Sequence, residues 1–243
     1  MAAQESNQRR LILTLAIGDA YQRMWSMVRP RWECYAERVG AEIAVIDRAE
    51  SPTHPFFDKL IQCERLALSG QWDRICFADC DEVPVSGAPD IFDCHPDPDV
   101  FYGVPGNLYF RKHLARRLRK IGRHWKTGRP PRYIFGGTFL FGPEHAEVFH
   151  WDRPQLMCVK LGREEGVIST RLMECSTPFG DMSPRWDAIP PWWPCHRPFF
   201  AHSDARSAGG KLLHFQRLFS RIPQDRITDD RPAELAALRE AWT

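Results

Sequence analysis

The sequence has no run of apolar residues long enough to cross a membrane, which argues against an integral membrane protein. A transmembrane helix needs about 18 apolar residues in succession, whereas the N-terminal apolar run covers only residues 11–17. That run is also too short for the core of a secretory signal peptide, and no cleavage pattern follows it. We therefore expect a cytoplasmic protein with a flexible N-terminus over residues 1–10.

The sequence also lacks paired cysteines and a strong net charge. Its eight cysteines are irregularly spaced and none form a Cys-x-x-Cys pair, so we expect scattered reduced thiols rather than a zinc site. The net charge is +2, and the hydrophobic and charged fractions of 43% and 26% are ordinary for a globular protein. Twenty prolines in 243 residues favour many ordered loops over a helical bundle. A chain of this length can form one large domain.

Hydrophobic periodicity in the N-terminal half predicts alternating strands and helices. The predicted strands are residues 11–17, 41–46 and 74–79, and the predicted helices are residues 20–39 and 56–69. Pro30 should kink or interrupt the first helix, and Gly40 should end it. This order is typical of an α/β fold in which a mostly parallel sheet is flanked by helices, with right-handed crossovers.

The second half of the sequence is less regular. It predicts a helical turn at residues 89–92, strands at 100–104, 133–141 and 211–215, and helices at 143–151, 162–173 and 229–242. Gly136 and Gly137 should interrupt the strand at 133–141, where glycines form a bulge or permit close approach by a ligand. No linker divides the chain, so we expect a single domain over residues 11–225 followed by a C-terminal helix over 226–243.

The most informative motif is Asp79-Cys80-Asp81, which follows an apolar run. Because alternate residues of a strand face the same side, both carboxylates can face one ligand while Cys80 points away. Two close carboxylates repel each other, and a divalent cation that holds a diphosphate would relieve that repulsion. Ligands of such sheets bind beyond the carboxyl ends of strands, where this triplet and Ile17-Gly18-Asp19 are both predicted to lie. In the simpler alternative, the two acids are turn residues that cap the strand.

Six segments share their order and spacing with one known family. They are residues 14–21, 59–60, 75–81, 137–141, 162–170 and 212–215. The first reads Thr-Leu-Ala-Ile-Gly-Asp-Ala-Tyr, the third ends in Asp-x-Asp, and the last is Leu-Leu-His-Phe. Together they resemble the glycogenin-like retaining glycosyltransferases, which have a Rossmann-like fold called GT-A. The resemblance implies a metal-dependent hexosyltransferase that uses a nucleotide diphosphate sugar, expected to be a UDP-sugar, and retains the anomeric configuration.

The resemblance also implies a set of site residues. Mn²⁺ or Mg²⁺ would be bound by Asp79, Asp81 and His214, and mixed carboxylate and imidazole ligation suits Mn²⁺. Glu164 would lie near the anomeric carbon, and Lys59 would place a positive charge beside the phosphates or the donor sugar. The donor would contact Leu15, Ala16, Ile17, Gly18, Tyr21, Lys59, Asp79, Cys80, Gly137 and Arg217. The nucleotide-binding half would cover about residues 11–110, and the acceptor-binding and metal-completing half about residues 111–225.

Several positions depart from the family pattern. Gly18 replaces an Asn, Phe135-Gly136 replace Asn-Ser, and Glu164-Glu165 replace Asp-Gln. The family's Gly and Lys beside the diphosphate have no match, and Arg217 or Arg221 could substitute for the Lys. These departures leave open an alternative in which the chain is a catalytically weak or inactive binding module with a GT-A-like fold.

The candidate residues also have ordinary alternatives. Lys59 could be a solvated helix residue, Tyr21 an aromatic of an amphipathic helix, and His214 a half-buried histidine. Glu164 could be a solvent-facing acid in the first turn of a helix, where acids are favoured. A nucleotidyltransferase or a phosphohydrolase would use the same carboxylates and metal.

One segment, from Arg111 to Arg132, is strongly basic. It holds ten Lys or Arg residues and no acid, with Leu114, Leu118 and Trp125 at helical spacing. Because like charges repel along a helix, this density indicates an anionic partner. We rank an anionic glycan acceptor first, an anionic membrane surface second and nucleic acid third.

Overall fold

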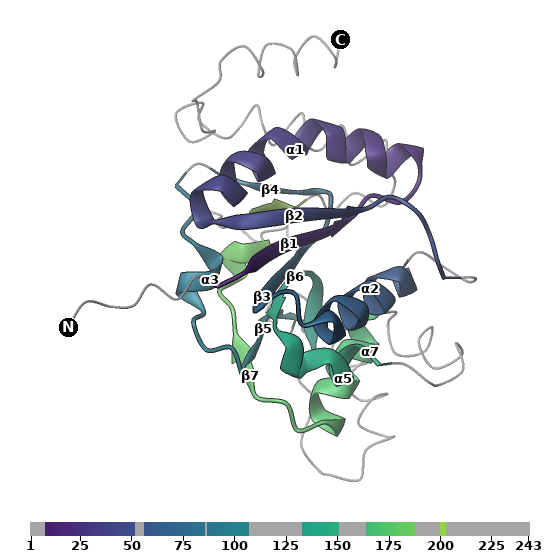
Figure 1. Cartoon of the computed structure of the whole chain (residues 1–243), viewed down its shortest axis with the longest axis vertical. Coiled ribbons are helices and arrows are strands. Elements are labelled where there is room, and N and C mark those ends of the chain that lie inside the picture. The colour runs from purple at the N-terminus through teal and green to yellow at the C-terminus, as the bar shows by residue number, and fades with distance from the viewer. Residues whose placement is uncertain are drawn as a thin grey trace, which may run out of the picture.

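The computed structural model describes residues 8–51, 56–85, 87–106, 133–150, 164–187 and 200–202. In these ranges the chain forms a three-layer α/β fold, in which a central sheet is covered by helices on both faces (Figure 1). The predicted fold class is therefore confirmed. The basic segment, the predicted strand at 211–215 and the predicted C-terminal helix lie outside the described residues.

The central sheet has six strands in the order β2-β1-β3-β6-β5-β7. Their bounds are β1 Arg10–Leu15, β2 Ala41–Ile46, β3 Arg74–Ala78, β5 Phe101–Pro105, β6 Ile134–Phe141 and β7 Phe179–Asp181. β1 pairs in parallel with β2 and β3, and β5 with β7, whereas β6 lies antiparallel between β3 and β5. Two short strands, β4 Glu82–Pro84 and β8 Phe200–His202, form a separate antiparallel ladder.

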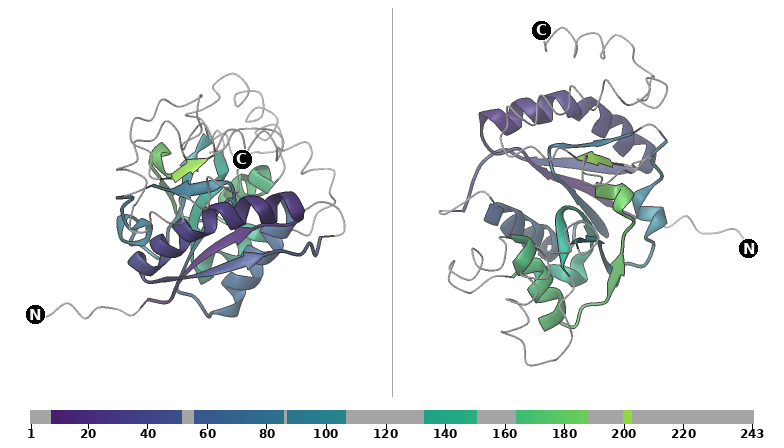
Figure 2. Two further views of the ribbon diagram at one scale, coloured as in Figure 1. Left: turned by 90° about the horizontal axis from the view of Figure 1, so that it is seen from above. Right: turned by 180° about the vertical axis from the view of Figure 1, so that it is seen from behind.

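Helices of different lengths cover the two faces (Figures 1 and 2). α1 lies on one face together with the β4–β8 ladder, and α2, α5 and α7 lie on the other face. The bounds are α1 Asp19–Val39, α2 Phe56–Ser69, α3 Ile91–Cys94, α5 Ala146–Phe149 and α7 Glu164–Glu174, with 3₁₀ helices η2 Pro143–His145 and η3 Pro184–Asp187. Each layer has its own apolar core, with Trp32 of α1 in one and Leu60 of α2 in the other.

The helix α1 is continuous, so the prediction that Pro30 would interrupt it is wrong. One face of the helix is buried against the sheet, including Met24, Val28 and Trp32. Burial of these side chains outweighs the loss of one backbone hydrogen bond at proline. Gly40 ends the helix as predicted, with φ of 62° in the left-handed region and its N–H directed at carbonyls of the last turn.

Strand ends and interruptions differ from the predictions in smaller ways. β6 is one strand of eight buried residues, but its pairing with β5 shifts register between Phe139 and Ile134, so the predicted irregularity at Gly136 and Gly137 is present without ending the strand. β1 ends at Leu15 and β3 at Ala78, before the loops that lead away from the sheet. The predicted helix at 143–151 is a 3₁₀ turn followed by the short α5. The three-residue strands β4, β7 and β8 had no periodicity from which to predict them.

The expectations about membrane-spanning helices and about cysteines can be compared with the described residues. Within them, no helix combines the length and hydropathy that a membrane span requires. The six cysteines in these ranges are all free thiols, and Cys63, Cys76 and Cys80 are buried. Burial raises the pKa of the Cys63 thiol, which makes it unreactive at neutral pH.

Candidate functional site

The carboxyl ends of β1 and β3 lie side by side. The two strands pair in parallel with Leu13 opposite Phe77, so residues 16–18 and 79–81 emerge at the same edge of the sheet. Gly18 precedes α1 with φ of 90°, a value that residues with a side chain rarely adopt. The sequence therefore turns from β1 into α1 at the edge where ligands of this fold class bind.

The predicted donor-loop residues lie around this turn. Leu15 ends β1, and Ala16 is buried and donates its N–H to the backbone of β2 at 2.8 Å. Ile17 is partly exposed and Gly18 is exposed. Tyr21 has 38% of its surface exposed, so it is not one of the aromatic residues that pack α1 against the sheet. An exposed aromatic side chain is suited in its chemistry to stacking with the ring of a ligand.

The Asp79-Cys80-Asp81 triplet is part of a turn. β3 ends at Ala78, and the Glu82 N–H donates to the Asp79 carbonyl oxygen at 2.9 Å, which closes a four-residue turn. The Asp79 N–H donates to the Gly137 carbonyl oxygen at 3.0 Å, which extends the pairing of β3 with β6. The alternation of side chains along a strand therefore does not describe residues 79–81, because these residues follow the end of β3.

The three side chains of the triplet have different environments. Cys80 is buried in the apolar core beneath α1. The Asp79 side chain is 29% exposed. Asp81 is only 2% exposed. The turn thus presents one carboxylate to solvent and encloses the other.

Lys59 of α2 is buried beside this turn. Its ammonium donates to Asp79 Oδ1 at 3.1 Å, to Glu164 Oε1 at 3.3 Å and to the Gly136 carbonyl oxygen at 2.7 Å. Burial alone would lower the pKa of Lys59, but the carboxylates of Asp79 and Glu164 outweigh burial and raise it above its usual value. Lys59 is therefore a permanently charged link between two elements, and the solvated alternative is wrong.

The absence of a side chain at Gly136 makes room for this link. A Cβ at this position would lie 2.9 Å from Glu165 Cγ, 3.3 Å from Lys59 Nζ and 3.4 Å from Glu164 Oε1. A real Cβ essentially never approaches another atom as closely as the first of these distances. Glycine at this position thus leaves space for the three charged side chains that surround it.

Two neighbouring acids in the first turn of α7 complete the cluster. Glu165 accepts hydrogen bonds from the Tyr133 hydroxyl and, at 3.2 Å, from the Gly136 N–H. Burial, together with the neighbouring Glu164 carboxylate, raises the pKa of Glu165. Glu164 is buried, and its Oε2 has no hydrogen-bond partner among the described residues. The alternative in which Glu164 is a solvent-facing acid is therefore wrong.

Counted over the described residues alone, the acid–lysine cluster (Lys59, Asp79, Glu164 and Glu165) has one cation for three carboxyl groups. The raised pKa of Glu165 shows how the protein accommodates this excess, because a proton on that residue removes one negative charge. The cluster still has more negative than positive charge when Asp79 and Glu164 are ionised. Such a site favours a cation or a positive charge that develops on a ligand.

The structure brings together some of the predicted residues. Lys59, Asp79 and Glu164 are in direct contact, and Gly137 binds the Asp turn through its backbone. His214 and Arg217 lie outside the described residues. Within the described ranges, no three His, Cys, Asp or Glu residues form a group that could hold a metal on its own.

Glu165 and Tyr133 are the cluster residues that sequence reasoning missed. The only signal for Glu165 was its position next to Glu164, and nothing in the sequence singled out Tyr133. Their contact joins α7 to the start of β6 across 32 residues of sequence, so it depends on tertiary packing.

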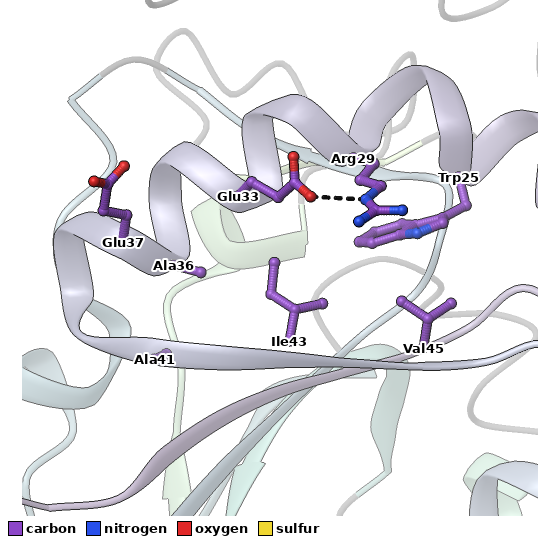
Figure 3. Close-up of a pocket in the computed structure, with 8 residues that line it drawn as sticks. All are labelled: Trp25, Arg29, Glu33, Ala36, Glu37, Ala41, Ile43 and Val45. Carbon is purple, nitrogen blue, oxygen red and sulfur yellow. Dashed lines mark hydrogen bonds and ion pairs between the residues drawn. The ribbon is translucent and has the colours of Figure 1, made fainter.

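A pocket elsewhere on the molecule is separate from this cluster. It has a volume of about 400 Å³ and lies between α1 and β2 (Figure 3). Trp25, Ile43 and Val45 provide apolar walls, and the Arg29–Glu33 ion pair lies on the helix side. The pocket shares no residue with the acid–lysine cluster or with the Asp79–Glu82 turn.

Solved structures with a similar fold are glycosyltransferases. One is a glycosyltransferase involved in the glycosylation of the major capsid of PBCV-1, with a TM-score of 0.61 and 12% identity over 86% of this chain and 99% of that chain. Another is the galactosyltransferase LgtC in complex with donor and acceptor sugar analogs, with a TM-score of 0.51 and 11% identity over 94% of this chain and 99% of that chain. The chain has the GT-A fold.

At these identities the likeness to the two enzymes is one of fold. No model of a known protein family matches the sequence, and no curated protein matches it either. The narrower resemblance to glycogenin-like enzymes stays a prediction. In this GT-A fold the acid–lysine cluster lies next to the carboxyl ends of β1 and β3, the edge at which sheets of this class bind ligands.

Proposed function

We propose that the protein is a metal-dependent hexosyltransferase that moves a sugar from a UDP-sugar to an acceptor with retention of configuration. The observation that carries this proposal is the bridge made by buried Lys59 between Asp79 of the turn and Glu164 of α7. This bridge joins the residues assigned to the diphosphate to the residue assigned to the sugar. It lies at the strand ends where a ligand of a GT-A fold is expected.

The carboxylate chemistry of the turn supports a divalent cation as its ligand. Carboxylate oxygens are the preferred ligands of Mg²⁺ and Mn²⁺, and Asp79 is accessible to solvent while held on a turn fixed by backbone hydrogen bonds. Asp79 and Asp81 would hold the metal, with the imidazole of His214 as the proposed third ligand. When bound, the metal would neutralise negative charge on the diphosphate.

The chain's own residues have distinct roles in this proposal. Lys59 fixes the positions of the Asp79 and Glu164 carboxylates and shields their mutual repulsion. Glu164 faces the anomeric carbon with Oε2, the oxygen that has no partner among the described residues, and stabilises the positive charge that develops there. Tyr21 lies exposed on the base side of the turn and stacks on the uracil ring. The acceptor is an anionic glycan that binds near the basic segment.

A thermal-shift experiment tests the proposal first. UDP with Mn²⁺ should raise the melting temperature of the wild-type protein, because a ligand that binds only the folded state stabilises it. Asp81→Asn should abolish the shift, whereas Asp93→Asn, which changes an exposed acid of α3, should leave it unchanged. UDP-, GDP- and CDP-sugars should then be screened for Mn²⁺-dependent hydrolysis.

Two outcomes of this experiment would contradict the proposal. If no nucleoside diphosphate shifts the melting temperature, the protein has no donor site of the proposed kind. A shift of equal size with and without Mn²⁺, unaffected by Asp81→Asn, would favour the binding-module alternative over a metal-dependent enzyme.

A further inference from the structure

A second set of buried polar residues lies on the other side of the Asp79–Glu82 turn. Glu82 and Thr138 are fully buried, and Trp32 is nearly so. They come from three separate elements, β4, β6 and α1. None of the three was assigned a role by the sequence or by the proposed function.

These residues fix the end of the turn from two directions. Trp32 Nε1 of α1 donates to the Glu82 carbonyl oxygen at 2.8 Å. Thr138 Oγ1 of β6 donates to the Glu82 carboxylate at Oε2 and also lies 3.1 Å from the Trp186 carbonyl oxygen of η3. Glu82 is thus held both through its main chain and through its side chain.

The other end of the same turn is held by the sheet. Thr138 pairs with Ala78, and the next residue of β6 towards its N-terminus, Gly137, accepts the Asp79 N–H. β6 therefore contacts the turn at both of its ends. The two aspartates lie between these fixed points, so the positions of their carboxylates depend on β6 and α1.

We infer that Thr138, Glu82 and Trp32 are positioning residues, which hold the Asp79–Glu82 turn in the geometry needed to bind the metal and diphosphate. This inference rests on the proposed function, because it assigns the turn the metal-binding role given there. Burial of a carboxylate is unfavourable unless it is hydrogen-bonded, and the Thr138 hydroxyl supplies one such bond, at Glu82 Oε2.

The test compares two variants that each remove one buried hydroxyl. Thr138→Val removes the hydroxyl that holds Glu82 and keeps the shape of the side chain. Tyr35→Phe, the matched control, removes a buried hydroxyl of α1 that bonds the Pro89 carbonyl oxygen at 2.9 Å and the Ile91 N–H at 3.0 Å, away from the turn. Both variants should lower the melting temperature of the free protein, because each loses buried hydrogen bonds.

A positioning role is separated from a purely stabilising one by a Mn²⁺ titration in the presence of UDP. The quantity measured is the Mn²⁺ concentration at which the rise in melting temperature reaches half of its maximum. Loss of residues that orient metal ligands typically weakens metal affinity ~10–100-fold, so Thr138→Val should raise this concentration at least ~10-fold. Tyr35→Phe should leave it unchanged. Thr138→Ser keeps the hydroxyl and should restore the wild-type value. Trp32→Phe removes the second anchor and should raise the Mn²⁺ requirement independently of Thr138.

Different results would overturn the two proposals. If the wild type shows a metal-dependent shift but Thr138→Val and Trp32→Phe need no more Mn²⁺ than Tyr35→Phe does, the positioning role is wrong and the proposed function stands. If Thr138→Ser behaves like Thr138→Val, the hydroxyl has no such role. If the wild type shows no metal-dependent shift, the proposed function fails and this inference fails with it.

Discussion

A cation is buried at each end of strand β3, and the two cations have different kinds of partner. Arg74 begins the strand, and Lys59 packs against its other end, with its ammonium 4.4 Å from the centre of the Phe77 ring. Arg74 donates to the backbone carbonyl oxygens of His95 and Asp97 and stacks over Tyr102. Its partners are neutral groups, whereas Lys59 has two carboxylates.

The pKa values of the two cations shift in opposite directions. Burial lowers the pKa of the Arg74 guanidinium, because the loss of solvent outweighs the opposing effects of Tyr102 and Asp97. The carboxylates around Lys59 overcome the same effect and raise its pKa. Arg74 thus fixes the loop that follows α3. Its hydrogen-bond partners there are neutral carbonyl oxygens, unlike the carboxylates around Lys59. The end of β3 with surplus negative charge is the one at which a ligand is expected.

The largest expected effects come from removing each cation in turn. Lys59→Met leaves buried carboxylates without their counter-charge and should lower the free energy of unfolding by about 3–5 kcal/mol. Arg74→Met leaves two carbonyl oxygens without donors, at about 1–3 kcal/mol each. Unfolding in urea measures both changes. Lys59→Met should also remove the UDP–Mn²⁺ thermal shift, and Arg74→Met should preserve it.

A second substitution sharpens this contrast. Adding Glu164→Gln to Lys59→Met removes one of the uncompensated charges and should recover part of the lost stability. Adding Glu164→Gln to Arg74→Met should recover none. Equal behaviour of the two double variants would mean that the two ends of β3 do not differ as described.

The fold was largely predictable because its main elements have strong local signals. The bounds of α2 and β2 were predicted to the residue, since the apolar patterns agree with a glycine directly after α2 and a glycine directly before β2. The continuity of α1 through Pro30 was not predictable, because it depends on packing against the sheet. The short strands β4 and β8 pair with each other, with Pro84 opposite Phe200, so neither strand could be predicted from local sequence.

The candidate site was predictable only in part. Lys59, Asp79 and Glu164 were expected at one site and are in contact. The orientation of the Asp79–Glu82 turn and the contact of Glu165 with Tyr133 were not expected, because they arise where β6 passes between β3 and α7. Sequence motifs predicted which residues meet, and tertiary packing decides how they are oriented.

A smaller effect should follow from adding one methyl group to the cluster. Gly136→Ala places a Cβ 2.9 Å from Glu165 Cγ and 3.3 Å from Lys59 Nζ, so the cluster must shift at a cost of about 1–3 kcal/mol. Sugar transfer should fall with it, because the Lys59 contacts set the positions of two carboxylates. Gly103→Ala in β5 is the matched control, since its Cβ meets no atom closer than 3.4 Å. Equal loss of activity in both variants would show that the cluster tolerates the methyl group.

The smallest expected effect is a pH dependence caused by Glu165. Burial and the Glu164 carboxylate raise the pKa of Glu165 from 4.5 to about 7. Between these values the folded protein holds a proton that the unfolded chain releases, so the free energy of unfolding should fall as pH rises, by at most about 1.4 kcal/mol per pH unit. Glu165→Gln should flatten this dependence in urea unfolding measured across the window, whereas Glu144→Gln, at an exposed position, should not. An unchanged slope in Glu165→Gln would mean that the excess negative charge beside Lys59 is compensated elsewhere.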